Sequence, residues 1–211
     1  LTVTGLAWLF SVTIVFSQPS QLIKDIMPGP ASSSSSEFVV AGDLIYFKAD
    51  DGTSGLEIWA TDGTDNGTYL VKDIRTGTLS SFPSNLTAMG NRLYFTANDA
   101  VSGIEIWTSD GTETGTYIVK EIIAGGGTAN PSNLVAIDGW LYFTANTSAG
   151  VEMWRSDGTE AGTNLVHDIN PNGDAYPYHY TGMNGEVFFS AIDGVHGLEL
   201  WKTDGTVPGT V

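Results

Sequence analysis

The chain has 211 residues, of which 8 are Lys or Arg and 24 are Asp or Glu, so its formal net charge at pH 7 is −16. This balance argues against nucleic acids and anionic membrane surfaces as partners, because both require a cationic face. The chain contains no cysteine, which excludes disulfides, cysteine-ligated zinc and thiol catalysis.

The first segment is typical of an export signal. Residues 1–17 contain no charged side chain, and residues 6–16 are almost continuously apolar. This run is shorter than the ~20 residues of a membrane-spanning helix and suits the core of a signal peptide, with cleavage expected between Ser17 and Gln18. We therefore predict a protein that is secreted or held at the cell surface, with no stable membrane span once the signal is removed. A buried N-terminal strand or helix is the alternative.

Residues 18–36 are expected to hold an isolated strand, at residues 22–26, and a loop rich in Pro, Gly and Ser. The rest of the chain repeats one unit four times. In each copy a hydrophobic-Glu-hydrophobic-Trp segment is followed, three residues after the Trp, by Asp-Gly-Thr and then by a Gly-Thr pair. The four tryptophans, which are 48, 47 and 47 residues apart, are Trp59, Trp107, Trp154 and Trp201.

A repeat of this length predicts an all-β protein built as a β-propeller of four-stranded antiparallel blades. Val, Ile, Tyr, Phe, Trp and Thr fill the expected strands, and Gly, Asn and Asp mark the turns between them. The expected blades span residues 37–83, 84–130, 131–177 and 178–211. Because the last unit stops where its fourth strand is expected, we predict that residues 22–26 complete this blade and close a four-blade ring. A piece of a longer propeller or repeat array and an open stack of sheets remain as alternatives.

The string Glu-hydrophobic-Trp-x-x-Asp-Gly-Thr resembles the ELWxxDGT repeat of secreted bacterial proteins, a family loosely labelled hyalin-like. The resemblance covers nearly all of residues 22–211. Ile58, Ile106 and Met153 replace the middle Leu of the motif, which only Leu200 keeps. The resemblance implies a propeller-like extracellular or surface protein, and it implies no catalytic residues because the family has no established reaction.

The residues that recur in every unit are expected to build the fold. The Asp of each Asp-Gly-Thr, namely Asp62, Asp110, Asp157 and Asp204, is expected to accept backbone amides and cap a turn. Calcium binding is the alternative role, in which carbonyl groups and waters must supply most of the roughly 6–8 oxygens. No cofactor is otherwise required. The Glu beside each Trp is expected to pair with a fourth-strand Lys or with backbone amides, and the four Trp side chains are expected between blades; these glutamates are Glu57, Glu105, Glu152 and Glu199.

A candidate binding site lies where the units differ. The same position, at the start of the innermost strands, is occupied by Glu37, Asn85, Asn133 and His179. In a ring these side chains would converge near the mouth of the axial channel, where they could hold a cation or a small polar ligand. Solvated side chains at loop edges are the alternative.

Catalytic motifs are not apparent, since the sequence has no nucleophile elbow, no phosphate-binding loop in a strand-to-helix context and no Ser/His/Asp ordering. We therefore expect a secreted, non-enzymatic module for binding, adhesion or surface structure, with an extracellular glycan or protein as ligand. The alternatives are a secreted carbohydrate-active propeller, which binds or cleaves glycans, and a purely structural piece of a longer repeat protein.

Overall fold

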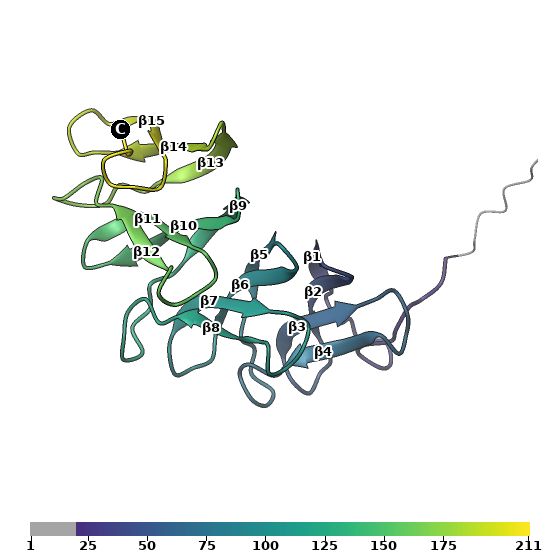
Figure 1. Ribbon diagram of the computed structural model, residues 1–211. Helices are drawn as coiled ribbons and strands as arrows, with labels where there is room; N and C mark the ends of the chain where they lie inside the picture. The colour runs from purple at the N-terminus through teal and green to yellow at the C-terminus, as the bar shows by residue number, and fades with distance from the viewer. Residues whose placement is uncertain (1–19) are drawn as a thin grey trace, which may run out of the picture.

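The computed structural model describes residues 20–211, so the expected signal peptide and its cleavage site lie outside the described residues. The described chain folds into sheets of consecutive antiparallel strands, which we call blades 1 to 4 (Figure 1). Blade 1 consists of β1 (Ser36–Ala41), β2 (Leu44–Asp50), β3 (Leu56–Thr61) and β4 (Thr68–Lys72). Blade 2 consists of β5 (Ser84–Met89), β6 (Arg92–Asn98), β7 (Ile104–Ser109) and β8 (Tyr117–Lys120). Blade 3 consists of β9 (Ser132–Ile137), β10 (Trp140–Thr147), β11 (Gly150–Ser156) and β12 (Asn164–His167).

Blade 4 has three strands, β13 (Tyr178–Met183), β14 (Glu186–Ile192) and β15 (Leu198–Thr203). Beyond β15 the chain turns back, and Val211 exchanges two backbone hydrogen bonds with Lys202, at 2.8 and 3.0 Å. Blades 1 to 3 therefore have the predicted four strands, whereas in blade 4 only the first residue of a fourth strand is paired. Within residues 20–211, no helix is long and apolar enough to cross a membrane.

The blades are arranged as an arc. The first strands of neighbouring blades contact one another, β1 with β5, β5 with β9 and β9 with β13. These strands form the concave side of the arc, and β4, β8 and β12 form its convex side (Figure 1). The arrangement is that of propeller blades around part of a ring, because all four inner strands lie on one side.

The predicted ring closure is not seen. Blades 1 and 4 lie at opposite ends of the arc (Figure 1), and blade 4 contains no segment from the N-terminal part of the described chain. Residues 22–26 are not a strand, and they lie instead against blade 1, where Ile26 packs with Phe47 and Trp59. The apolar side chains of this segment thus find their partners on blade 1, while blade 4 of the same chain lies at the other end of the arc.

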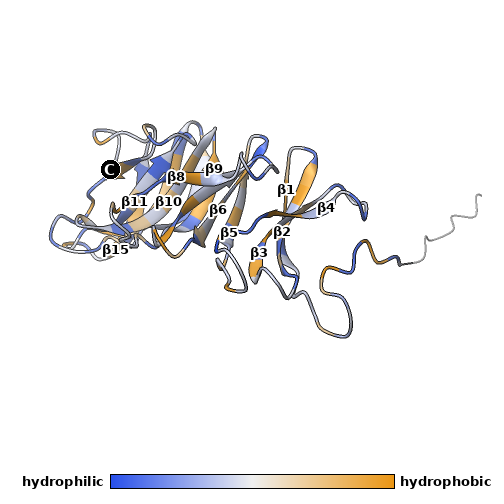
Figure 2. Ribbon diagram, turned by 90° about the horizontal axis from the view of Figure 1, so that it is seen from below, coloured by the Kyte–Doolittle hydropathy of each residue, from blue (hydrophilic) through white to orange (hydrophobic). Residues whose placement is uncertain are grey.

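The core of the molecule lies between the blades. Each blade has a leading face toward the next blade and a trailing face toward the preceding one. The register is the same in every blade, with Phe opposite Trp on the trailing face; the pairs are Phe47–Trp59, Phe95–Trp107, Phe143–Trp154 and Phe189–Trp201. Between blades 1 and 2, Tyr46 and Ile58 of one leading face pack with Phe95 and Trp107 of the next trailing face. Figure 2 shows the sheets stacked in a row, with apolar residues also on β1 at its end. Both faces of each sheet are therefore apolar, as in sheets that are covered on both sides.

Candidate functional site

The four Asp-Gly-Thr turns have the same internal geometry. In each, Oδ1 of the Asp accepts the backbone amide of the Thr two residues later, at 2.8–3.0 Å, and its hydroxyl, at 2.6–2.7 Å. The central Gly has a positive φ of 86–92°, a conformation that glycine adopts without a steric cost. The turns formed by Asp62, Asp110, Asp157 and Asp204 thus have the predicted capping geometry.

These hydrogen bonds also set the ionisation of the turn carboxylates. The hydroxyl and amide of Thr64 hold the pKa of Asp62 below its usual value, and Thr112, Thr159 and Thr206 have the same effect on Asp110, Asp157 and Asp204. Within the part of the chain that the structure describes, no three His, Asp or Glu side chains lie close enough together to hold a metal ion. The calcium role of these turns therefore stays a prediction that the geometry does not strengthen.

The Glu of each motif is buried in blades 1 to 3. Glu57 accepts the amide and the hydroxyl of Ser81, at 2.9 and 2.5 Å, and the amides of Ile74 and Arg75, at 3.3 and 3.4 Å. Burial raises its pKa to about 7, although Ser81 and the two amides act in the opposite direction. The predicted pairing with backbone amides is thus observed.

Glu105 and Glu152 are less completely paired. Each uses Oε2 to accept one amide, from Ile122 at 3.2 Å and from Ile169 at 3.0 Å, while Oε1 is buried without a partner. Burial raises the pKa of both carboxyls to about 7. In blade 4 the corresponding Glu199 is exposed. Each buried Glu therefore fixes the chain segment that leads from its own blade into the next one.

The fourth-strand lysines have a different role from the one expected. Nζ of Lys72 donates to the carbonyl oxygen of Thr116 at 2.9 Å, and Nζ of Lys120 donates to that of Thr163, also at 2.9 Å. These contacts join the outer strand of one blade to the Asp-Gly-Thr turn of the next. The lysines therefore link neighbouring blades instead of neutralising the buried glutamates.

The predicted binding residues lie at equivalent places on the four inner strands. All four have a left-handed backbone; Glu37, Asn85, Asn133 and His179 have φ values of 54, 56, 55 and 61°. Each lies where the pairing between the first and second strands of its blade shifts register. Because successive inner strands contact one another, the structure lines these positions up along the concave side of the arc, without the ring that sequence reasoning expected.

Three of these side chains contact the second strand of their own blade, and the fourth packs on its own strand. The Glu37 carboxylate forms an ion pair with Lys48. The amides of Asn85 and Asn133 donate to Thr96 and Thr144, at 3.2 and 3.4 Å. The His179 ring packs edge-on against Tyr178, with 4.4 Å between the ring centroids.

A second row of residues, which sequence reasoning missed, lies three positions earlier in each blade. Ser34, Phe82, Asn130 and Tyr176 are all exposed and also left-handed, with φ values of 52, 52, 45 and 48°. The residue before each of them has a backbone carbonyl that accepts an amide from the end of the second strand, at 2.7–2.9 Å. The available signal was a Pro that directly follows Phe82, Asn130 and Tyr176, since the residue before a proline is conformationally restricted.

We call these eight positions the rim. In blades 2 to 4, the segment that leads into the rim follows the fourth strand of the preceding blade. In blade 1 the buried Glu57 binds this segment at Ser81, which directly precedes the rim residue Phe82. The Asp-Gly-Thr turns follow the third strands and therefore lie at the opposite end of each sheet. The rim presents exposed aromatic rings, amides, a carboxylate and an imidazole together, which is the chemistry of a site that recognises a polar ligand.

The fold is similar to β-propellers of known structure. The structure matches the acylaminoacyl peptidase of Pyrococcus horikoshii with a TM-score of 0.54 and 13% identity, over 82% of this chain and 26% of that chain. It matches the β-propeller domain of the Trilobed protease from Pyrococcus furiosus with a TM-score of 0.54 and 15% identity, over 82% and 52% of the two chains. For a putative TolB from Agrobacterium tumefaciens the TM-score is 0.50 and the identity 13%, over 83% and 64%.

The chain therefore spans less than two thirds of the length of each of these proteins. Identities this low show a shared propeller-like fold and carry no activity across. No protein-family model and no curated protein sequence matches the chain.

Proposed function

We propose that the chain is a non-enzymatic extracellular module that binds a glycan along its rim. The observation that carries the proposal is the row of left-handed, non-glycine residues at the same two positions of every blade, all of them exposed except the half-buried Asn85. Such backbone costs about 1–3 kcal/mol at each residue and occurs preferentially at ligand-binding sites. Of the eleven left-handed non-glycine residues within residues 20–211, eight are rim positions, and the other three, Ala100, Asp138 and Asn184, lie in loops between strands.

The rim side chains favour a carbohydrate over other polar ligands. Phe82 is 64% exposed and Tyr176 is 53% exposed, so each presents an aromatic ring to solvent. An exposed ring can pack against the C–H face of a sugar, and neighbouring amides such as those of Asn85 and Asn133 can bond its hydroxyls. The chemistry of the rim also changes from blade to blade, which suits a ligand that has several different contact points.

Binding without catalysis is supported by the position of the titratable groups. The carboxyls whose pKa burial raises to about 7 are Glu57, Glu105 and Glu152, and they lie fully buried between blades. A carboxylic acid that acts on a substrate must instead reach the bond it cleaves. The apolar leader predicted at residues 1–17 supports an extracellular location.

A glycan-array screen followed by calorimetry on the best ligand tests the proposal. Tyr176→Ala and Phe82→Ala should each weaken binding roughly tenfold, which corresponds to about 1.4 kcal/mol. Tyr117→Ala is the matched control, because Tyr117 is an exposed aromatic residue on β8, away from the rim. Absence of any glycan binding would overturn the proposal, and turnover of a bound glycan would replace it with the enzymatic alternative.

A further inference from the structure

The two ends of the arc carry sheet faces that have the same composition as the buried faces between blades. We propose that these ends are complementary docking surfaces for a second copy of this chain. Blade 4 of one copy packs against blade 1 of the other and takes up residues 22–26 of that copy as its fourth strand. The same contact, made twice, closes a ring of two copies.

The leading face of blade 4 is uncovered in a single chain. Leu200 is 75% exposed, whereas the residues at the same register position, Ile58, Ile106 and Met153, are 0%, 1% and 0% exposed. Leu198, two residues away on the same face, is 51% exposed. In blades 1 to 3 this face is covered by the next blade, and it is apolar in blade 4 although no other blade within residues 20–211 covers it.

The trailing face of blade 1 is the complementary surface. Ile45 is 37% exposed, whereas its counterparts Leu93, Leu141 and Val187 are at most 2% exposed. Phe38 is 62% exposed, and its ring stacks on Phe47 with 5.3 Å between the centroids. Both end faces are therefore apolar in a chain whose net charge is −16, and exposed apolar patches of this kind mark interaction sites.

Residues 22–26 already lie where the fourth strand of a blade before blade 1 would lie. Ile26 packs against Trp59 in one cluster, just as Ile74, at the end of blade 1, packs with Trp107 of blade 2. Lys24 also behaves like a fourth-strand lysine, because its Nζ donates to the carbonyl oxygen of Asp65, in the Asp-Gly-Thr turn of blade 1, at 3.0 Å. The segment therefore occupies the place that the end of a preceding blade would take.

The Lys24 contact has a direct counterpart inside the arc. Nζ of Lys120, at the end of blade 2, lies 3.4 Å from the carbonyl oxygen of Glu160, the residue that corresponds to Asp65 in the turn of blade 3. A blade that docks here needs no rearrangement of this segment, because the segment already has the inter-blade contacts of a fourth strand.

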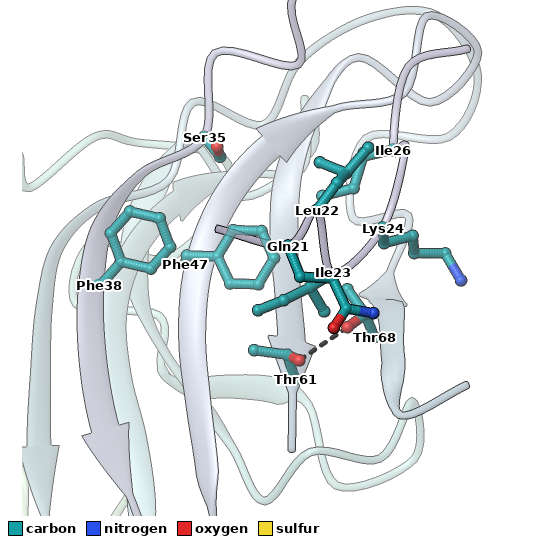
Figure 3. A pocket seen from close by; sticks show the side chains of 10 residues that line it. All are labelled: Gln21, Leu22, Ile23, Lys24, Ile26, Ser35, Phe38, Phe47, Thr61 and Thr68. Atoms are coloured by element: carbon teal, nitrogen blue, oxygen red, sulfur yellow. Dashed lines mark hydrogen bonds between the residues drawn. The ribbon is translucent and has the colours of Figure 1, made fainter. Parts of the chain in front are cut away.

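A cavity marks where the docking blade would insert a side chain. About 260 Å³ of space lies between residues 21–26 and the rings of Phe38 and Phe47 (Figure 3). Between blades 1 and 2, Ile58 of the leading face packs in the same cluster as Phe95. Leu200 of a second copy corresponds to Ile58 and would occupy this side of the cavity next to Phe47.

The hydrogen-bonding register of β15, the free edge strand of blade 4, also fits residues 22–26. In blade 1 the pairs between β3 and β4 are Ala60–Tyr69, Trp59–Leu70 and Ile58–Lys72. In blade 4, Lys202 and Val211 form the counterpart of the first pair. The next pairs would then join Trp201 to Leu22 and Leu200 to Lys24 of the second copy, so the incoming segment begins where Val211 ends.

The partner is a second copy because the two complementary ends of one chain lie at opposite ends of the arc (Figure 1). An interface between two different surfaces closes into a ring when the rotation allows it, and forms filaments otherwise.

A cysteine pair tests the contact directly, because the native chain has no cysteine. Paired residues on antiparallel strands have Cα atoms about 4.5–5.5 Å apart, within the range of a disulfide. Oxidation of the full-length Lys24→Cys/Leu200→Cys variant should give a covalent dimer on a non-reducing gel. A disulfide-linked monomer would instead establish closure within one chain, and failure to cross-link would also overturn the proposal.

Sedimentation of the full chain provides the second test. The unmodified chain should sediment as a dimer, and Leu200→Asp should sediment as a monomer that still melts in one cooperative transition, because Leu200 is exposed within its own chain. Val101→Asp is the matched control, since Val101 is 77% exposed in a loop of blade 2 and should leave the dimer intact. A monomeric unmodified chain, open polymers or a dimeric Leu200→Asp variant would each overturn the proposal.

Discussion

The buried glutamate of blade 3 provides a quantitative test of how the blades are joined. Glu152 is fully buried, Oε2 accepts the Ile169 amide at 3.0 Å, and Oε1 has no partner. Burial raises the pKa of this carboxyl from 4.5 to about 7. Glu152→Gln keeps an oxygen acceptor for the Ile169 amide and removes the ionisation.

The sign and size of the effect follow from this pKa. A carboxyl whose pKa is raised on folding stabilises the protein fully below pH 4.5, and this stability is lost as the pH rises through about 7. The full shift corresponds to at most about 3.4 kcal/mol. Local relaxation and water entry reduce the penalty of a buried charge, so we expect ionisation of Glu152 to lower the free energy of unfolding by about 1–2 kcal/mol.

Urea unfolding followed by tryptophan fluorescence, at about pH 5 and about pH 8, measures this loss. The free energy of unfolding of the unmodified chain should fall between these pH values, and Glu152→Gln should lose about 1–2 kcal/mol less than the unmodified chain. Glu113→Gln is the control, because Glu113 is exposed in a turn of blade 2 and should leave the pH profile unchanged. If Glu152→Gln lost stability in parallel with the unmodified chain, the link between this carboxyl and pH would be refuted.

Three further predictions concern the turns and the contact between blades 3 and 4. Gly162→Ala should destabilise the chain by about 1–3 kcal/mol in thermal melts, because an added Cβ would overlap the Asp157 carboxylate. Tyr180→Phe should cost about 1 kcal/mol, measured by urea unfolding, because the Tyr180 hydroxyl lies 2.8 Å from that of Thr144 and donates to the Pro177 carbonyl at 3.1 Å. Millimolar calcium should leave the melting temperature unchanged, because each Asp-Gly-Thr turn supplies one carboxylate, well short of the roughly 6–8 oxygens that calcium takes.

Each of these predictions has its own control or contrary outcome. Glu160→Ala changes an exposed side chain in the same turn as Gly162 and should leave the melting temperature unchanged. Tyr117→Phe removes the hydroxyl of an exposed tyrosine and should cost nothing measurable. A rise in melting temperature with calcium, lost on Asp157→Asn, would assign the turns a metal-binding role.

The sequence predicts the blades well because their determinants are local. The Trp and the Asp-Gly-Thr that follows it fix a strand and its turn within about ten residues, and the geometry at Trp59 and Asp62 is that expected from the residue pattern. The inter-blade position of the tryptophans follows equally from apolar residues on both faces of the strands.

Ring closure could not be predicted in this way, because it depends on the rotation between neighbouring blades, summed along the arc. The match between residues 22–26 and the fourth strands predicts that this segment completes blade 4, whereas in the structure it lies against blade 1. It does not determine whether blade 4 reaches the same place.

Of the eight rim positions, the sequence analysis predicted four and missed the other four. Asn85 and His179 were found because they differ between otherwise similar units, and the structure places both on inner strands of the concave side, in blades 2 and 4. Phe82 and Tyr176 were missed because nothing in their residue type reveals a left-handed backbone. Only the following proline, a restriction on local conformation, indicated that these positions were unusual.

The glutamate contacts also determine where a single chain should begin to unfold. Glu57, Glu105 and Glu152 each bind the segment that starts the following blade, so opening one blade releases its neighbour. Such coupling between adjacent units makes unfolding propagate from the ends of an array. Glu199 is exposed and blade 4 has only one residue of a fourth strand paired. In a dilute, unpaired chain, amide hydrogens of β15 should therefore exchange with solvent before those of β7, and protection should increase from blade 4 toward blade 2.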